Sequence, residues 1–451
     1  MRKTGKILLL LALLVLLAGC AKAAPDPTPT PVPMVVLPGG VEVPIDAESL
    51  DLTGVPTAET EAALAQLEAF PELRELQLGG EGLFTLEQVE RLQNEHPEWH
   101  LRYTLDLAGA EAELEADRVD LSALRATEVE RVLPRLRLMP RLRLVELGSE
   151  RAEGPDWEQI RELEEAAANA DLRYRFTIGD RTFDLADTEL DLNHIPMTDE
   201  GEQVRRIIAC MPNLNYLCMD SCEVSNEAMA AIRDDYPWVE VVWRIWFGAT
   251  YSVRTNVERI LASKTSWGGE MHGRDVQVLK YCTKVKYLDL GHNNNIDDIT
   301  FVRYMPDLEV FIIAMNCLVD ISPLEDCHKL EYLELFLTYV EDLSPLSGLT
   351  ELRHLNVGVC YCLHDITPIY GLNLERFFIG SAHGVPQEQI DEYKRLHPDC
   401  EVNDVSYDTS NGRWRYEDEY GTEFAPRYAL LREQFGYDEK AYSVYWLDPD
   451  Y

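Results

Sequence analysis

Apolar residues recur at a fixed interval along the C-terminal part of the chain. The order leucine, two residues, apolar, one residue, apolar appears at 308–313, 330–335, 352–357 and 374–379, and each segment begins 22 residues after the previous one. Alternate side chains of a strand point to opposite faces, so each segment fits a short strand with one apolar face. The pattern therefore predicts one short strand and one turn in every repeat.

A period of 20–29 residues with this apolar order is typical of leucine-rich repeats, which stack as the coils of a solenoid. The predicted fold class is α/β, with parallel strands on a concave face and helices and turns on a convex face. Such folds offer a broad surface for binding. We expect a regular region of 22–23-residue repeats at 281–384 and an aromatic-rich cap at 385–451.

The same apolar order recurs upstream at wider intervals. It begins at Leu73, Leu142, Leu214 and Val285, with steps of 69, 72 and 71 residues. Within each long unit the periodicity predicts a strand, a helix, the repeat strand, a second helix such as 86–94, and a hairpin at the junction. We interpret 45–280 as long, irregular repeats of about 70 residues.

Most short repeats continue with aspartate, an aliphatic residue, serine or threonine, and an apolar residue that is usually proline. Ser322 before Pro323 predicts an N-cap followed by the first residue of a short helical turn. This combination resembles the internalin-type repeats of secreted bacterial proteins, closely over 280–380 and loosely over 45–280. The chain departs from those proteins because it lacks a cell-wall sorting motif at its C-terminus.

The N-terminus predicts export and lipid anchoring. Three cationic residues precede an apolar run that ends Leu-Ala-Gly-Cys at Cys20, which resembles the lipobox of bacterial lipoproteins. That resemblance implies removal of the signal peptide 1–19 and acylation of Cys20, and hence an extracytoplasmic protein at the cell surface or in the periplasm. An ordinary secretory signal with an incidental cysteine is the alternative. Alternating prolines predict an extended tether over 20–44.

Net charge narrows the range of partners. The chain has 80 acidic and 41 basic residues and a formal charge of −39. Nucleic acid and anionic lipid head groups are therefore excluded as favourable partners, and contact with the membrane is expected through the lipid anchor alone. Most of this charge is interpreted as solvated surface.

Cysteine and histidine positions favour a structural role. Cys222, Asn316 and Thr338 lie eight residues after the first residue of a repeat strand, where a polar side chain bonds the neighbouring coil, and Cys360 lies at or beside that position. No known catalytic motif and no zinc-like ligand spacing appears, so we expect neither an enzyme nor a bound metal or cofactor. A disulfide between Cys210 and Cys218, or between Cys317 and Cys327, stays open.

Strand alternation identifies the side chains that face away from the repeat core. They form an aromatic and aliphatic stripe, and exposure of such a stripe is costly unless something covers it. We interpret it as the binding surface for an extracytoplasmic protein or glycan; the alternatives are a tail folded over the stripe and an envelope spacer without a diffusible ligand. The predicted contact residues are Tyr216, Tyr287, Val310, Ile312, Tyr332, Phe336, His354, Arg376 and Phe378.

Overall fold

The computed structural model describes residues 32–248, 251–263, 271–406, 408–409, 414–418 and 422–437. The chain divides into two compact units, of which the first comprises Met1–Asp117 with Pro134–Leu142 and the second comprises Arg118–Leu133 with Arg143–Tyr451. The predicted signal peptide and Cys20 lie outside the described residues. Within the described residues, no helix has the length and apolar character needed to cross a membrane.

The first unit is built on one four-stranded sheet with the order β3-β4-β5-β6. Its first three strands run parallel, whereas β5 and β6 form an antiparallel hairpin. The second helix predicted at 86–94 and the junction hairpin are confirmed. The elements are β3 (Ser49–Asp51), η1 (Thr57–Glu59), α1 (Thr60–Leu64), η2 (Leu67–Ala69), β4 (Glu75–Gly80), α2 (Leu86–Glu95), β5 (His100–Asp106) and β6 (Glu111–Glu113).

The predicted tether is wrong in its last part. Residues 34–44 form an antiparallel hairpin of β1 (Met34–Leu37) and β2 (Val41–Pro44). Gly39 and Gly40 both have positive φ, 84° and 78°, so they close a turn that a residue with a Cβ enters only with strain. The alternating prolines that favour an extended tether lie before this hairpin.

The second unit begins with three smaller sheets. A four-stranded sheet has the order β10-β9-β8-β7, a parallel sheet has the order β11-β12-β13, and β14 and β15 form a hairpin. Their strands are β7 (Arg118–Asp120), β8 (Leu144–Ser149), β9 (Asp171–Ile178), β10 (Arg181–Asp184), β11 (Glu189–Asp191), β12 (Tyr216–Cys218), β13 (Glu240–Val242), β14 (Arg244–Phe247) and β15 (Tyr251–Arg254). The accompanying helices are η3 (Ala126–Glu128), α3 (Val129–Arg137), α4 (Trp157–Ala166), α5 (Glu202–Ile208) and α6 (Asn226–Asp235).

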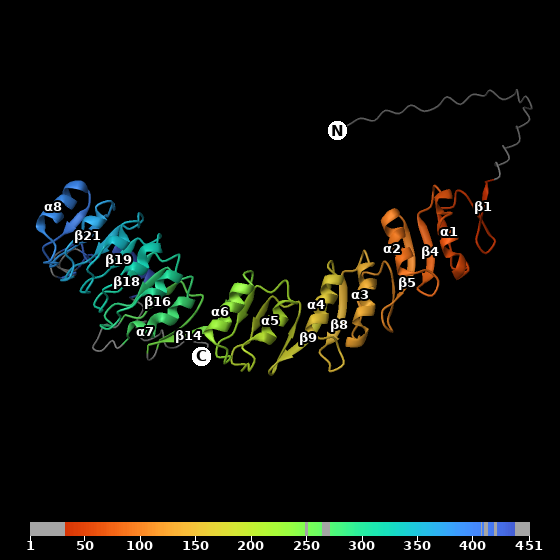
Figure 1. Ribbon diagram of the computed structural model, residues 1–451, viewed down its shortest axis with the longest axis horizontal. Helices are drawn as coiled ribbons and strands as arrows, with labels where there is room; N and C mark the ends of the chain where they lie inside the picture. Colours follow the sequence, from red (N-terminus) through yellow and green to blue (C-terminus); the bar gives the residue numbers. More distant parts are fainter. Residues whose placement is uncertain are drawn as a thin grey trace, which may run out of the picture. The chain divides into compact units, whose positions relative to one another are not determined.

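The regular repeats form one parallel sheet of seven strands in sequence order, and Figure 1 shows β16, β18, β19 and β21 side by side. The sheet begins before the predicted boundary at 281 and extends into the predicted cap. Its strands are β16 (Arg259–Leu261), β17 (Tyr287–Asp289), β18 (Val310–Ile312), β19 (Tyr332–Glu334), β20 (His354–Asn356), β21 (Arg376–Phe378) and β22 (Glu401–Asn403). The connecting helices are α7 (Gly273–Val276), η4 (Gln277–Tyr281), η5 (Thr300–Tyr304), η6 (Ser322–Asp326), η7 (Ser344–Leu346), η8 (Thr367–Ile369) and α8 (Gln387–Leu396).

Polar side chains eight residues after the first residue of a repeat strand, here called the ladder position, join neighbouring repeats. The Asn316 amide donates to the carbonyl oxygens of Leu290 and Ile313 at 3.0 and 3.1 Å, and the thiol of Cys360 donates to that of Leu335 at 3.3 Å. Because these side chains satisfy backbone groups inside the core, they replace hydrogen bonds that water would otherwise provide. The predicted structural role of this position is confirmed.

The predicted N-cap is wrong by one position. Ser322 is the first residue of η6, and its backbone N–H donates to the carboxylate of Asp320 at 2.8 Å. The same arrangement joins Ser344 to Asp342 at 2.7 Å. Aspartate accepts this bond because its carboxylate reaches the N–H two residues ahead, as in an Asx turn.

Candidate functional site

The seven-stranded sheet has one face against the repeat core and one face turned away from it, here called the outer face. Seven of the nine predicted contact residues lie on strands of this sheet, Phe336 lies two residues after the end of β19, and Tyr216 lies on β12 of the three-stranded sheet. The outer face combines apolar and acidic side chains: Tyr287, Asp289, Val310, Ile312, Ala314, Tyr332, Glu334, Phe336, His354, Arg376 and Phe378.

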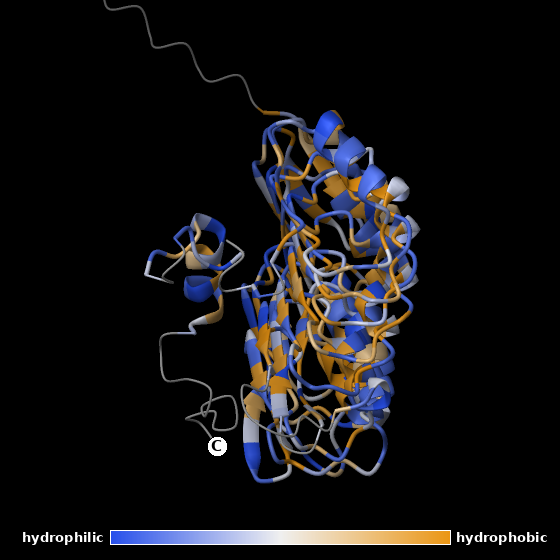
Figure 2. Ribbon diagram, turned by 90° about the vertical axis from the view of Figure 1, so that its left-hand side faces the viewer, coloured by the Kyte–Doolittle hydropathy of each residue, from blue (hydrophilic) through white to orange (hydrophobic). Residues whose placement is uncertain are grey.

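This outer face is covered by the chain itself. The described residues 414–418 and 422–437, here called the C-terminal segment, include α9 (Pro426–Phe435), and Figure 2 shows α9 on the opposite side of the strands from the repeat helices. Trp414, Leu431 and Phe435 are buried in one apolar cluster with side chains of the outer face. The segment therefore occupies the surface that we predicted for a partner.

The expectation of an exposed stripe is wrong. Val310, Tyr332 and Phe378 are no more than 1% exposed, Ile312 and His354 are buried as well, and Tyr287, Phe336 and Arg376 are partly buried. The alternative of a tail folded over the stripe describes the structure. The sequence shows which side chains leave the repeat core, but it does not show what lies on top of them.

The region predicted as a cap, 385–451, divides into two parts with different positions. Helix α9 packs against β16, the first strand of the sheet, and lies across the outer face. At the other end of the sheet, Tyr393 of α8 packs against Phe377 with 5.1 Å between ring centroids. Thus α8 covers the last apolar coil, and α9 has a different role.

Glu334 is the central polar contact between the outer face and the C-terminal segment. Its carboxylate is 1% exposed and accepts hydrogen bonds from Trp414 Nε1 at 3.1 Å and Arg415 Nη2 at 3.2 Å. The hydroxyl of Tyr332 donates to it at 3.0 Å. A buried carboxylate with three donors is stable where an unpaired one is not, because these bonds replace its hydration.

Asp289 makes a second buried contact with the segment. The hydroxyl of Tyr437 donates to its Oδ2 at 2.6 Å, and the backbone N–H of Gly291 donates to its Oδ1 at 2.9 Å. Burial raises the pKa of Asp289 above its ordinary value of 3.8, although both hydrogen bonds oppose this effect. Docking of the segment is therefore coupled to the protonation of Asp289.

Ion pairs and ring contacts complete this attachment. Arg376 lies 3.0 Å from Glu401 and also pairs with Glu417 of the segment. The guanidinium of Arg427 lies 5.8 Å from the centre of the Tyr332 ring. These contacts sit around the apolar cluster, where charged groups keep partial access to water and add little each.

His354 is buried beneath the segment as a neutral ring. Burial lowers its pKa to about 3, and the neighbouring positive charges of Arg427, Arg376 and Arg353 add to this effect. Its ring stacks on Tyr332 with centroids 5.8 Å apart. It therefore contributes packing rather than charge to the outer face at neutral pH.

Asp289 provides a pH-dependent test of docking. Burial in the docked protein holds the pKa of Asp289 above 3.8, so the contribution of Asp289 to docking is fully present below pH 3.8 and is lost as pH rises through the raised pKa. We expect Asp289→Asn to retain the segment better than the wild-type chain at pH 8 and to lose this pH dependence. Hydrogen exchange of the α9 amides, corrected for intrinsic rates, measures it; equal pH profiles in both proteins would contradict the coupling.

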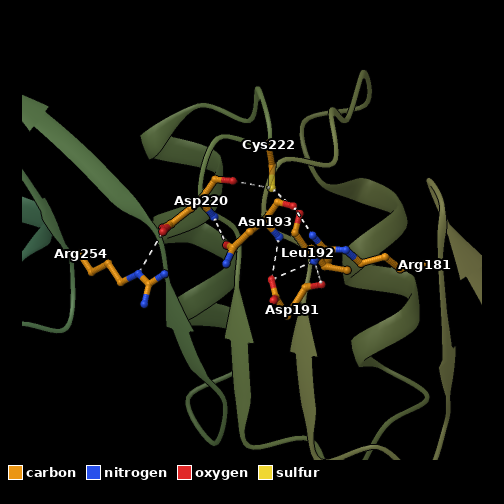
Figure 3. A network of polar contacts seen from close by, with 7 residues as sticks. All are labelled: Arg181, Asp191, Leu192, Asn193, Asp220, Cys222 and Arg254. Carbon is orange, nitrogen blue, oxygen red and sulfur yellow. Dashed lines mark hydrogen bonds and ion pairs between the residues drawn. The ribbon is translucent and has the colours of Figure 1, made fainter. Parts of the chain in front are cut away.

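A separate buried network lies on the three-stranded sheet (Figure 3). Asp220 is 2% exposed, and its Oδ2 accepts a hydrogen bond from Arg254 Nε at 3.0 Å and lies 3.7 Å from Arg244 Nε. Its backbone N–H donates to Asn193 Oδ1 at 2.7 Å. Both arginines come from the β14–β15 hairpin, so the network joins that hairpin to the end of β12.

The cysteines serve the repeat core. The thiol of Cys222 donates to Leu192 O at 3.1 Å, and Cys282 and Cys327 are buried in the repeat core. Burial raises the pKa of the Cys222 thiol to about 11, which keeps it protonated. Among the described residues all nine cysteines are free thiols, and no group of three His, Cys, Asp or Glu side chains gathers to hold a metal.

The strands of the short repeats pair in one common register. Each short strand of the seven-stranded sheet pairs in parallel with the next, and the apolar positions align across the repeats, as in Leu333 with Leu355 and Leu355 with Phe377. The chain has a leucine-rich-repeat fold. The sequence matches no protein-family model, and no curated protein matches it.

Solved leucine-rich-repeat structures resemble the chain at low identity. Internalin C2 of Listeria monocytogenes is 18% identical with a TM-score of 0.25, covering 49% of this chain and 75% of its own. A leucine-rich-repeat protein of Leptospira interrogans is 13% identical with a TM-score of 0.27, covering 75% and 91%. The functional domain of InlJ from Listeria monocytogenes is 12% identical with a TM-score of 0.25, covering 68% and 69%. These likenesses carry no argument about function, and the repeat assignment rests on the register of the chain's own strands.

Proposed function

We propose that this protein is a lipid-anchored, extracytoplasmic scaffold whose leucine-rich-repeat solenoid binds another protein through the outer face. The observation that supports this is the complementarity between that face and a polypeptide segment that does not belong to the repeats. Aromatic side chains of the outer face pack against apolar rings of the segment, and two buried carboxylates of the face accept hydrogen bonds from it. Clusters of aromatic anchors of this kind dominate protein–protein interfaces.

A protein partner is favoured over a glycan by the nature of the occupant. The contacts of Glu334 are with an indole N–H and a guanidinium, which are groups of a protein and not of a sugar. Lipid attachment at Cys20, as the sequence predicts, would place this face outside the cytoplasm. Binding would then involve partners in the envelope or at the cell surface.

An envelope spacer without a diffusible ligand is the second candidate. The observation that favours it is that the outer face is already covered, so its aromatic side chains have no need of a further partner. In that case the C-terminal segment is a permanent part of the fold. The two candidates differ in whether another protein ever lies against this face.

Site-specific photo-crosslinking in intact cells tests the proposal. A photoreactive residue at Phe336, which is partly buried on the outer face, is expected to give adducts with another protein. The same residue at Tyr304, 56% exposed on η5 away from that face, is the matched control and should give none. Cys20→Ser should remove acylation and release the protein from the membrane. Adducts from both positions alike, or from neither, would favour the spacer.

A further inference from the structure

The outer face contacts its occupant through two parts of one apolar cluster. At one, the indole of Trp414 lies 5.2 Å from the Tyr332 ring and 6.2 Å from the Phe378 ring, between centroids. At the other, Leu431 and Phe435 of α9, four residues apart on one side of a helix, pack in the cluster that includes Leu261. An occupant therefore needs a tryptophan and a short helix with two apolar side chains.

The polar contacts add a second requirement. Both deeply buried acids of the face, Glu334 and Asp289, are met by donors of the segment, and none of these donors is a backbone group. Arg427 of the segment also lies 3.6 Å from Glu331 at the edge of the face. Because an unpaired buried carboxylate is costly, the face discriminates against apolar segments that lack donors.

The segment depends on few anchors. Among the described residues 414–418 and 422–437, those that are buried are Trp414, Ala425, Leu431 and Phe435, while Leu430 is 44% and Phe424 36% exposed. It adds no strand to the seven-stranded sheet, whose order ends at β22. A segment attached by a few side chains, and not by a backbone ladder, leaves without breaking the repeat fold.

We propose that the outer face is a peptide-binding site, that the C-terminal segment is its exchangeable resident occupant, and that a partner binds by presenting a Trp-Arg pair followed by a helix with a Leu/Phe pair four residues apart. This inference rests on the proposed function and names its partner class. A tethered segment competes at a local concentration in the millimolar range, so the resident occupant sets the affinity that a partner must exceed. Removal of its anchors lowers that threshold.

Binding of a free peptide to the full chain tests exchange. The probe is a fluorescent peptide with the sequence of residues 414–437, measured by anisotropy against the wild-type chain and against Trp414→Ser/Phe435→Ser, which removes two anchors of the resident segment. We expect the double variant to bind the probe at least tenfold more tightly than wild type, because its own segment no longer competes. Adding Glu334→Gln on the face should weaken the probe at least tenfold, since Arg415 of the probe loses its charged partner.

Two controls distinguish exchange of the segment from non-specific binding of the probe. A peptide of the same composition in scrambled order should bind at least tenfold more weakly. The variant Arg415→Gln keeps every apolar anchor of the segment, so the chain that carries it should bind the probe with an affinity between those of wild type and the double variant. It replaces the double variant as the test protein if the double variant is poorly folded. No probe binding by either variant, with circular dichroism unchanged, overturns the inference, as does equal binding of the scrambled peptide.

The outcomes also distinguish this inference from the proposed function. Probe binding without any crosslinked partner in cells leaves the peptide site intact and removes the proposed function. Crosslinked partners without probe binding retain the proposed function, but they show that the partner class inferred from the segment is wrong.

Discussion

Asp220→Ala is expected to lower the free energy of unfolding of the second unit by about 3 to 5 kcal/mol, because it removes one partner of a buried ion pair. Asp220 is the carboxylate against which two arginines of the β14–β15 hairpin are placed. The Arg244 side chain is 6% exposed and has little access to water, whereas Arg254 is 30% exposed and recovers some hydration.

Urea unfolding followed through hydrogen exchange of β12 and β15 amides measures this effect, because local exchange remains interpretable where a long repeat array does not unfold in one step. The matched control is Asp234→Ala, whose carboxylate is 71% exposed beside Arg233 and is expected to change stability by less than about 0.5 kcal/mol. Asp220→Asn, which keeps an acceptor but not the charge, should fall between the two. Equal effects of Asp220→Ala and Asp234→Ala would show that the network contributes nothing to stability.

Glu334→Ala is expected to detach the C-terminal segment, with a loss of about 3 to 5 kcal/mol in docking, while the repeats stay folded. The substitution leaves the indole N–H of Trp414, the guanidinium of Arg415 and the hydroxyl of Tyr332 without their common acceptor. Each buried donor left unsatisfied costs about 1 to 3 kcal/mol, more for a charged one. The repeat core lies on the other face of the sheet and keeps its own contacts.

Detachment has two observable consequences. The aromatic side chains of the outer face become exposed and bind a hydrophobic dye, and the segment becomes sensitive to limited proteolysis. Glu325→Ala on η6 is the control, because that carboxylate is 54% exposed beside Arg303 and its loss should change neither signal. A segment that stays protected in Glu334→Ala would mean that its apolar anchors suffice without the buried acid.

The repeat architecture could be predicted because each coil repeats the same local requirement. Leu333, Leu355 and Phe377 lie in one buried row, and a one-residue slip would turn every one of them to the wrong face. The ladder position was equally predictable, since Asn316 must bond backbone groups of its own turn and of the preceding coil. Periodicity reports such requirements directly.

Local details that depend on a competing partner were predicted less well. Ser322 was expected to cap η6, but it is the first residue of that helix and its own N–H donates to Asp320. Serine and aspartate both favour the start of a helix, so the sequence alone does not show which of them accepts a backbone hydrogen bond there. The hairpin at 34–44 was not predicted, because the alternating prolines before it favour an extended chain. Nothing in the sequence indicated that Asp220 would be buried with the arginines of β14 and β15, which follow it by more than twenty residues.

The repeat fold, its register and the side chains that leave the core follow from the apolar pattern of the chain. The sequence also predicted an exported chain with Cys20 as its lipid anchor, which lies outside the described residues. The covering of Tyr332, Glu334 and Phe378 by the chain's own C-terminal segment, in contrast, becomes visible in the folded molecule alone. The alternation of residues in a strand shows that a side chain on this face requires apolar contacts or hydrogen-bond donors. It does not show what provides them, because an aromatic stripe covered by a distant segment of the chain and one covered by another protein have the same sequence pattern.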